Sequence, residues 1–162
     1  MPLSLFLLPL ALQITHTPPI VKGTGLPPAD SDEGAVMAPV QRLLAGIGAR
    51  DAAMVASAEL AEGGGATIVT ENADGTRTVT RRSWAEVNAR FTPGPEKYAE
   101  RLLDPVIETD GSVAVVWSPY VFYVDGKLHH CGMDHFDLVK TDGGWKIANL
   151  TWSSRTTGCD AQ

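Results

Sequence analysis

Three Asp-Gly pairs, at positions 110–111, 125–126 and 142–143, separate four long segments that are rich in apolar and β-branched residues. An Asp-Gly pair between such segments is typical of a tight hairpin, because aspartate and glycine tolerate the positive φ angles that two-residue turns need. The segments run from Tyr98 to Thr109, Val113 to Val124, Lys127 to Lys140 and Trp145 to Arg155. The sequence therefore predicts an antiparallel meander in the C-terminal part of the chain.

Helical patterns precede these segments. Apolar residues from Val36 to Ile47 recur at helical spacing, and a second short helix capped by Asp51 can extend to Ala58. Ser83 and Glu86 have the spacing of a capping box for a third helix. A hairpin of residues 66–70 and 76–80 is expected between the second and third helices. Helices followed by a long meander predict an α+β fold, in which a cone-shaped, curved antiparallel sheet wraps around the N-terminal helices and encloses a pocket.

The first residues differ in composition from the rest. Residues 3–14 are almost wholly apolar, and residues 15–28 are rich in proline. A stretch of twelve residues is too short to span a bilayer and suits the core of a signal peptide. We therefore expect a signal peptide at 1–14, a disordered linker at 15–34 and one domain at 35–162, in a protein that is periplasmic or secreted without stable membrane insertion. A disordered or mis-started N-terminus is the alternative.

Composition and motifs exclude several functions. The 162 residues carry a net charge of −6 with no basic stripe, so nucleic acid is not expected as a partner. The run Gly63-Gly64-Gly65 precedes a predicted strand, and no dinucleotide, phosphate-loop or serine-nucleophile motif occurs. No cofactor is predicted. His129, Cys131 and His135 fall on the opposite face of one strand from His130 and Asp134, so the five residues cannot converge on one metal ion. We expect surface histidines beside a disulfide, and a metal pair of His129 and Cys131 is the alternative.

Asp134 is the candidate at the centre of a pocket, because it shares a strand face with Phe136 and Leu138. Burial against an indole would raise its pKa and let it act as an acid, with His130 as a base. The alternative is an ionised Asp134 that is bonded within the protein. If the turns contain two residues each, the register places the other pocket candidates beside these two: Trp117, Tyr120, Tyr123, Asn149, Thr151 and Arg155.

The same register predicts an apolar patch on the opposite face. Trp152, Leu150 and Met133 would lie together there and form a homodimer interface. The two cysteines, Cys131 and Cys159, predict a disulfide if the chain is exported, whereas a reducing compartment would leave two free thiols.

Several of these pieces, taken in order, resemble the SnoaL-like, nuclear transport factor 2-like superfamily. They are Val40-Gln41-Arg42-Leu43-Leu44 with Arg50-Asp51, then Asp134-His135-Phe136, then Gly143-Gly144-Trp145-Lys146-Ile147, and the resemblance spans about Val36 to Arg155. It implies a cone-shaped α+β fold. Within the superfamily, ketosteroid isomerase has an aspartate that matches Asp134. In that enzyme the aspartate stays protonated and donates a hydrogen bond in the oxyanion hole, which is an established part of its mechanism. Its tyrosine and general-base positions fall at Leu43 and about Thr70, so the resemblance does not extend to its mechanism.

The exported members of the superfamily, some of them lumazine-binding-like, are the most similar in pattern and imply a small aromatic or polycyclic ligand. We therefore predict an exported small-molecule-binding protein with one carboxylate in an apolar pocket. The alternatives are a cyclase, isomerase or dehydratase that uses Asp134 as acid or oxyanion donor, and a dimerising accessory module with a vestigial pocket.

Overall fold

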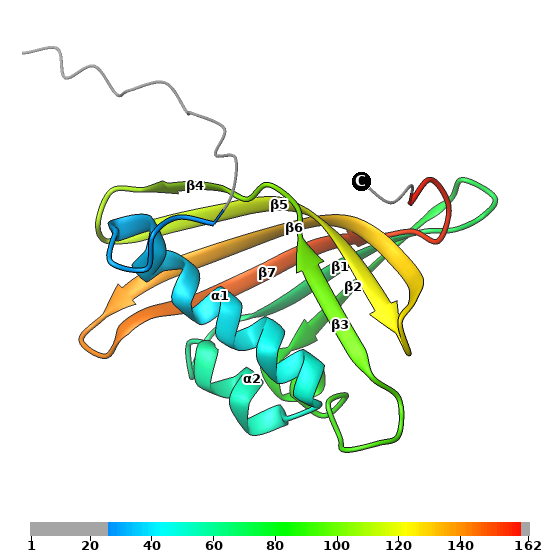
Figure 1. Cartoon of the computed structure of the whole chain (residues 1–162), viewed down its shortest axis with the longest axis horizontal. Coiled ribbons are helices and arrows are strands. Elements are labelled where there is room, and N and C mark those ends of the chain that lie inside the picture. The colour runs from blue at the N-terminus through cyan, green and yellow to red at the C-terminus, as the bar shows by residue number, and fades with distance from the viewer. Residues whose placement is uncertain (1–25, 160–162) are drawn as a thin grey trace, which may run out of the picture.

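A long, curved sheet wraps around three helices in the computed structural model, which describes residues 26–159 (Figure 1). The predicted signal peptide lies outside the described residues. The helices are α1 (Asp32–Ala49), α2 (Ala52–Ala58) and α3 (Trp84–Asn88). The strands are β1 (Gly65–Glu71), β2 (Arg77–Ser83), β3 (Tyr98–Leu102), β4 (Val106–Thr109), β5 (Val113–Val124), β6 (Lys127–Thr141) and β7 (Gly144–Ser154). The α+β class is therefore confirmed.

Local capping defines the helix starts. Ser31 caps α1 and accepts a hydrogen bond from the Gly34 amide at 3.0 Å, so the helix begins at Asp32 and includes the last three residues of the predicted linker. Asp51 caps α2 as predicted. Both hydrogen bonds of the predicted capping box, between Ser83 and Glu86, are present at the start of α3.

The predicted strand from Tyr98 to Thr109 is divided into β3 and β4. Asp104 has a φ of 55°, and Pro105 follows it, so the chain turns between the two strands. Both strands nevertheless pair with β5.

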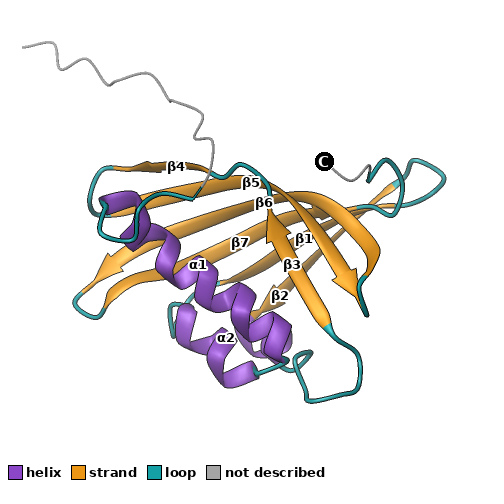
Figure 2. Ribbon diagram, viewed as in Figure 1, coloured by secondary structure: helices purple, strands orange, loops and turns teal. Residues whose placement is uncertain are grey.

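The strand order is β2-β1-β7-β6-β5-β3, with β4 also on β5. The meander of β5, β6 and β7 is antiparallel as predicted, but β1 pairs with β7 in parallel, so the expectation of an antiparallel sheet is corrected to a mixed one. The helices lie against the concave face of this sheet (Figure 2). In the buried core, Val36, Val40 and Leu43 of α1 belong to the same cluster as Phe136 and Leu138 of β6.

Two β-bulges change the predicted register. Between β5 and β6, Phe122 pairs with His130 but Tyr123 pairs with Leu128, so His129 is an extra residue on β6. Between β6 and β7, Asp137 pairs with Asn149 but Leu138 pairs with Ile147, so Ala148 is an extra residue on β7. A shift of one residue exchanges the two faces of a strand, so every predicted pairing beyond each bulge is wrong by one position.

The inner and outer faces follow from the observed register. Trp152 lies opposite Asp134 on the inner face, and Leu150 lies opposite Phe136. The predicted outer patch of Trp152, Leu150 and Met133 therefore does not exist. The outer face instead exposes Trp117 and Val113, whose relative exposures are 50% and 54%.

Candidate functional site

The main cavity has a volume of about 550 Å³ and lies between the helices and the inner face of the sheet. The helices contribute apolar side chains, among them Leu43, Val55 and Val87. Six aromatic residues also line the cavity: Trp84, Phe91, Tyr98, Tyr120, Phe122 and Trp152. Its charged or imidazole side chains are those of Arg82, Arg90, Glu100, His129, His130 and Asp134. An apolar cavity with a few convergent polar groups is the usual form of a small-molecule site.

Asp134 lies in the middle of the cavity wall on β6. It sits between Ser118 of β5 and Trp152 of β7, and only 3% of its surface is exposed. Its Oδ2 atom is buried without a hydrogen-bond partner among the described residues, since the Ser118 hydroxyl donates to backbone carbonyl oxygens instead. Among the described residues, the side-chain hydrogen-bond partner within reach of this carboxyl is a second carboxyl, that of Glu100, and no amide, hydroxyl or cationic side chain donates to it.

Glu100 on β3 is a second carboxyl beside Asp134. It lies opposite Phe122 on the inner face, and its side chain comes within hydrogen-bonding reach of the Asp134 carboxyl. Burial raises the pKa of Glu100 to about 7, and burial together with the neighbouring Glu100 raises the pKa of Asp134 well above its usual value. Two such carboxyls retain at least one shared proton near neutral pH.

Glu100 is not among the site residues predicted from the sequence. Its signal in the sequence is weak, because residues 98–109 resemble one continuous strand and the order of the strands does not follow from the sequence. Glu100 is partly buried, as are Tyr98 and Leu102 on the same face of the strand. The intervening Ala99 and Arg101 are exposed. That alternation places it on the inner face, but only the pairing of β3 with β5 brings it near β6.

His130 lines the same cavity. Its ring stacks on Phe122 at a centroid distance of 4.7 Å, and its Nδ1 lies 2.9 Å from Nδ1 of His129. Burial, followed by the charges of His129 and Arg90, lowers the pKa of His130 to about 4. His130 is therefore neutral at physiological pH and can accept or donate one hydrogen bond.

Tyr120 forms part of the cavity wall between the two carboxyls and the disulfide. Its hydroxyl donates to the carbonyl oxygen of Ser153 at 2.9 Å, so its ring crosses over Gly132, the residue opposite it on β6. Burial and the nearby Asp134 and Glu100 charges raise the pKa of Tyr120, which keeps the phenol protonated. Tyr120 thus supplies an aromatic surface rather than an acid.

The structure brings together three of the predicted site residues: Asp134, His130 and Tyr120 all line the main cavity. It places the other five elsewhere. Trp117 and Thr151 both lie opposite His135, and Asn149 lies opposite Asp137, so these three are on the outer face. Tyr123 lies next to the first bulge, outside the cavity lining. Leu43 and Thr70, which match the isomerase positions, do line the cavity.

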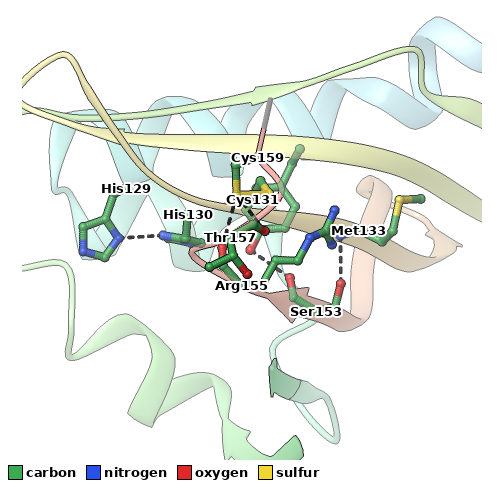
Figure 3. The surroundings of a disulfide bond; sticks show 9 residues. His129, His130, Cys131, Met133, Ser153, Arg155, Thr157 and Cys159 are labelled. Carbon is green, nitrogen blue, oxygen red and sulfur yellow. Dashed lines mark hydrogen bonds between the residues drawn. A yellow bond between two sulfur atoms is a disulfide. The ribbon is translucent and has the colours of Figure 1, made fainter. Parts of the chain in front are cut away.

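Arg155 belongs to a different surface, beside the disulfide (Figure 3). The sulfur atoms of Cys131 and Cys159 are joined, and Arg155 exchanges two backbone hydrogen bonds of 3.0 Å with Cys131. Arg155 lines a smaller cavity of about 250 Å³ that the disulfide also lines. The prediction that Arg155 reaches the Asp134 pocket is wrong, because the bulges shift the end of β7 relative to β6.

Two further observations concern metal ligands and helix length. Within residues 26–159, no group of three or more His, Cys, Asp or Glu side chains is arranged to hold a metal ion. Among the helices of that same stretch, none combines the length and apolarity that crossing a membrane requires.

Comparison with known proteins supports the fold. No protein-family model matches the chain, and no curated protein matches its sequence. A solved NTF2-like protein with a cystatin-like fold from Novosphingobium aromaticivorans is similar over 80% of this chain and 86% of its own, with 16% identity and a TM-score of 0.62.

Two other solved structures carry functional names. The β subunit of a candidate aromatic-ring-hydroxylating dioxygenase from Novosphingobium aromaticivorans covers 76% of this chain and 88% of its own, at 10% identity and a TM-score of 0.61. A candidate dehydratase of the NTF2-like family from Streptomyces avermitilis covers 75% of this chain and 94% of its own, at 17% identity and a TM-score of 0.57. The chain has the cone-like NTF2-like fold that these proteins share, as the sequence resemblance predicted.

Proposed function

We propose that the protein binds a small, largely apolar molecule of the aromatic or polycyclic class in the main cavity. The observation that carries the proposal is the Asp134 carboxyl, which is buried in a cavity walled mostly by aromatic and aliphatic side chains and has only a second carboxyl, that of Glu100, within hydrogen-bonding reach among the described side chains. A buried acceptor without a donor costs free energy, and a ligand donor would offset that cost.

The proposed roles follow from position. Asp134 and Glu100 hold the polar group of the ligand, while Tyr120, Phe122 and Trp152 contact its apolar body. No ligand contact in this cavity is assigned to the five predicted residues that lie outside it: Trp117, Tyr123, Asn149, Thr151 and Arg155.

Tryptophan fluorescence of the full-length protein tests this proposal. Trp84 and Trp152 line the cavity, so a ligand that enters it should change their emission. We expect saturable quenching by one class among flavin or lumazine precursors, steroids, aromatic polyketides and aromatic or alicyclic amines. The Trp152→Phe variant should lose much of that response, whereas Trp117→Phe should keep it because Trp117 is on the outer face. Absence of saturable quenching with every class would contradict the proposal.

A second candidate function is acid–base catalysis of the isomerase, cyclase or dehydratase type. The observation that favours it is the pair of carboxyls with raised pKa values beside a neutral His130, because groups of this kind can donate and accept protons near pH 7. Asp134→Asn would then abolish turnover while ligand affinity changes little. In a binding protein, the same substitution would lower affinity alone.

We also propose that the protein is exported and forms a homodimer. The disulfide between Cys131 and Cys159 suits an oxidising compartment, and the exposed Trp117 and Val113 on the outer face of the sheet suit an interface. Light scattering after size exclusion should give twice the chain mass, and Trp117→Lys should give the monomer mass. A monomer at all concentrations would contradict the dimer.

A further inference from the structure

We propose that the ligand is an organic cation: a protonated amine on an aromatic or alicyclic body, with its ammonium group between Asp134 and Glu100. This inference rests on the proposed function and names the ligand class of the same cavity.

The two carboxyls converge on one place in the cavity. Asp134 on β6 and Glu100 on β3 project from the inner face on either side of β5, and their side chains come within hydrogen-bonding reach. Asp134 is 3% exposed, and its Oδ2 atom lacks a donor. An ammonium group carries up to three N–H donors and could satisfy this oxygen and Glu100 together.

No cationic side chain of the described residues neutralises this pair. The ion pairs found within residues 26–159 do not include Glu100 or Asp134. Arg82, which also lines the cavity, lies on β2, and strands β1 and β7 separate it from Asp134 on β6 (Figure 1). Arg90 is exposed at the end of α3. Because the two carboxyls share a proton, at most one negative charge remains on the pair, and that charge is left for a ligand to compensate, since a buried charge without a partner is costly.

Aromatic rings surround the carboxyls. Trp152 is the cross-strand neighbour of Asp134, and Phe122 is that of Glu100. Tyr98 lies two residues before Glu100 on the same face, and its ring centroid is 5.5 Å from that of Phe122. The negative faces of aromatic rings attract cations, most strongly where water is excluded. The cavity thus combines the two features that recognise a protonated amine, whereas a neutral alcohol would offer the carboxyls one O–H donor and no positive charge.

The test compares amines with alcohols of the same shape. Isothermal titration calorimetry at pH 7 with the full-length protein uses three pairs of increasing size: 2-phenylethylamine and 2-phenylethanol, 1-adamantylamine and 1-adamantanol, and 1-pyrenemethylamine and 1-pyrenemethanol. We expect at least one amine to bind about tenfold or more tightly than its alcohol, as a charge-assisted hydrogen bond in a desolvated site would give. Glu100→Gln and Asp134→Asn should each reduce that preference to roughly threefold or less.

A matched control is available on the same strand. Asp137 lies on the outer face of β6, so Asp137→Asn removes one carboxylate and should leave the amine preference unchanged. Circular dichroism would check that each variant is folded, and Glu100→Gln on the short strand β3 provides a second variant if Asp134→Asn does not fold. Equal or tighter binding of the alcohols would overturn the amine inference and leave the proposed function standing. Failure of all six compounds to bind would also overturn it, and the fluorescence panel would then decide the proposed function separately.

Discussion

Trp152 on β7 lies directly opposite Asp134 on β6, with both side chains on the wall of the main cavity. Trp117, on β5, lies on the other side of the sheet with half of its surface exposed. The two indoles therefore report on different surfaces of the protein, which allows the register of the sheet to be tested in solution without a ligand.

At a concentration low enough for the protein to be monomeric, Trp117→Phe should shift the fluorescence maximum to shorter wavelength and lower the quenching constant for acrylamide. The reason is that Trp117 is 50% exposed, whereas Trp84 is 7% exposed. Trp84→Phe is the matched control and should raise the average quenching by removing a protected indole. If Trp117→Phe left the acrylamide quenching unchanged, the outer-face position of Trp117 would be wrong.

The paired carboxyls should make the folded state less stable as the pH rises. The pKa of Glu100 is raised from 4.5 to about 7, so between these values the folded state holds a proton that the unfolded chain has released. The free energy of unfolding contributed by this group is greatest below pH 4.5 and falls as the pH approaches 7. Glu100→Gln removes this effect and should gain roughly 1–3 kcal/mol relative to wild type across that interval.

His130 should act in the opposite direction. Its pKa is lowered from 6.5 to about 4, so between these values the unfolded chain binds a proton that the folded state excludes. Its contribution to the free energy of unfolding therefore rises with pH from 4 to 6.5. His130→Gln should lose stability relative to wild type as the pH rises through this interval. Urea denaturation at several pH values measures both variants, and slopes of the same sign for the two differences would contradict the assignments.

Gly132→Ala should destabilise the protein by about 2 kcal/mol or more. A Cβ atom at Gly132 would collide with the backbone carbonyl oxygen of Ser153 and would lie 2.9 Å from Cε1 of Tyr120. The backbone cannot move away without breaking the β6–β7 pairing. Gly143→Ala is the matched control, since its nearest contact would be an ordinary 3.7 Å to Oγ1 of Thr141. Thermal denaturation should separate the two variants, and equal midpoints would refute the close approach at Gly132.

Removal of the disulfide should lower the free energy of unfolding by about 2–4 kcal/mol, because the bond closes a long loop in the unfolded chain. Cys131 and Cys159 are 28 positions apart, and the bond ties the C-terminal end of the described chain to β6. The double variant Cys131→Ser/Cys159→Ser measures the loss by chemical denaturation. The wild-type protein in reducing buffer should match the double variant; a double variant as stable as the oxidised wild type would contradict this expectation.

Local features of the fold could be predicted from the sequence because they depend on neighbouring residues. The Asp125-Gly126 turn joins β5 to β6, and the Ser83 and Glu86 side chains make the capping box by themselves. Side-chain alternation within one strand likewise placed Asp134 on the same face as Phe136 and Leu138.

The site could not be predicted completely, because its partners are chosen by the curvature and order of the strands. The bulge at Ala148 inserts one residue into β7, and that insertion exchanges Thr151 for Trp152 opposite Asp134. The bulge at His129 likewise moves the partner of Trp117 from Asp134 to His135. Glu100 meets Asp134 only because β3 and β6 pair with opposite edges of β5. The sequence by itself determined the elements, the caps and the face that Asp134 occupies, through short-range hydrogen bonds and strand alternation. The tertiary structure decided what lies beside Asp134, since a one-residue shift that costs little locally reverses every side chain beyond it.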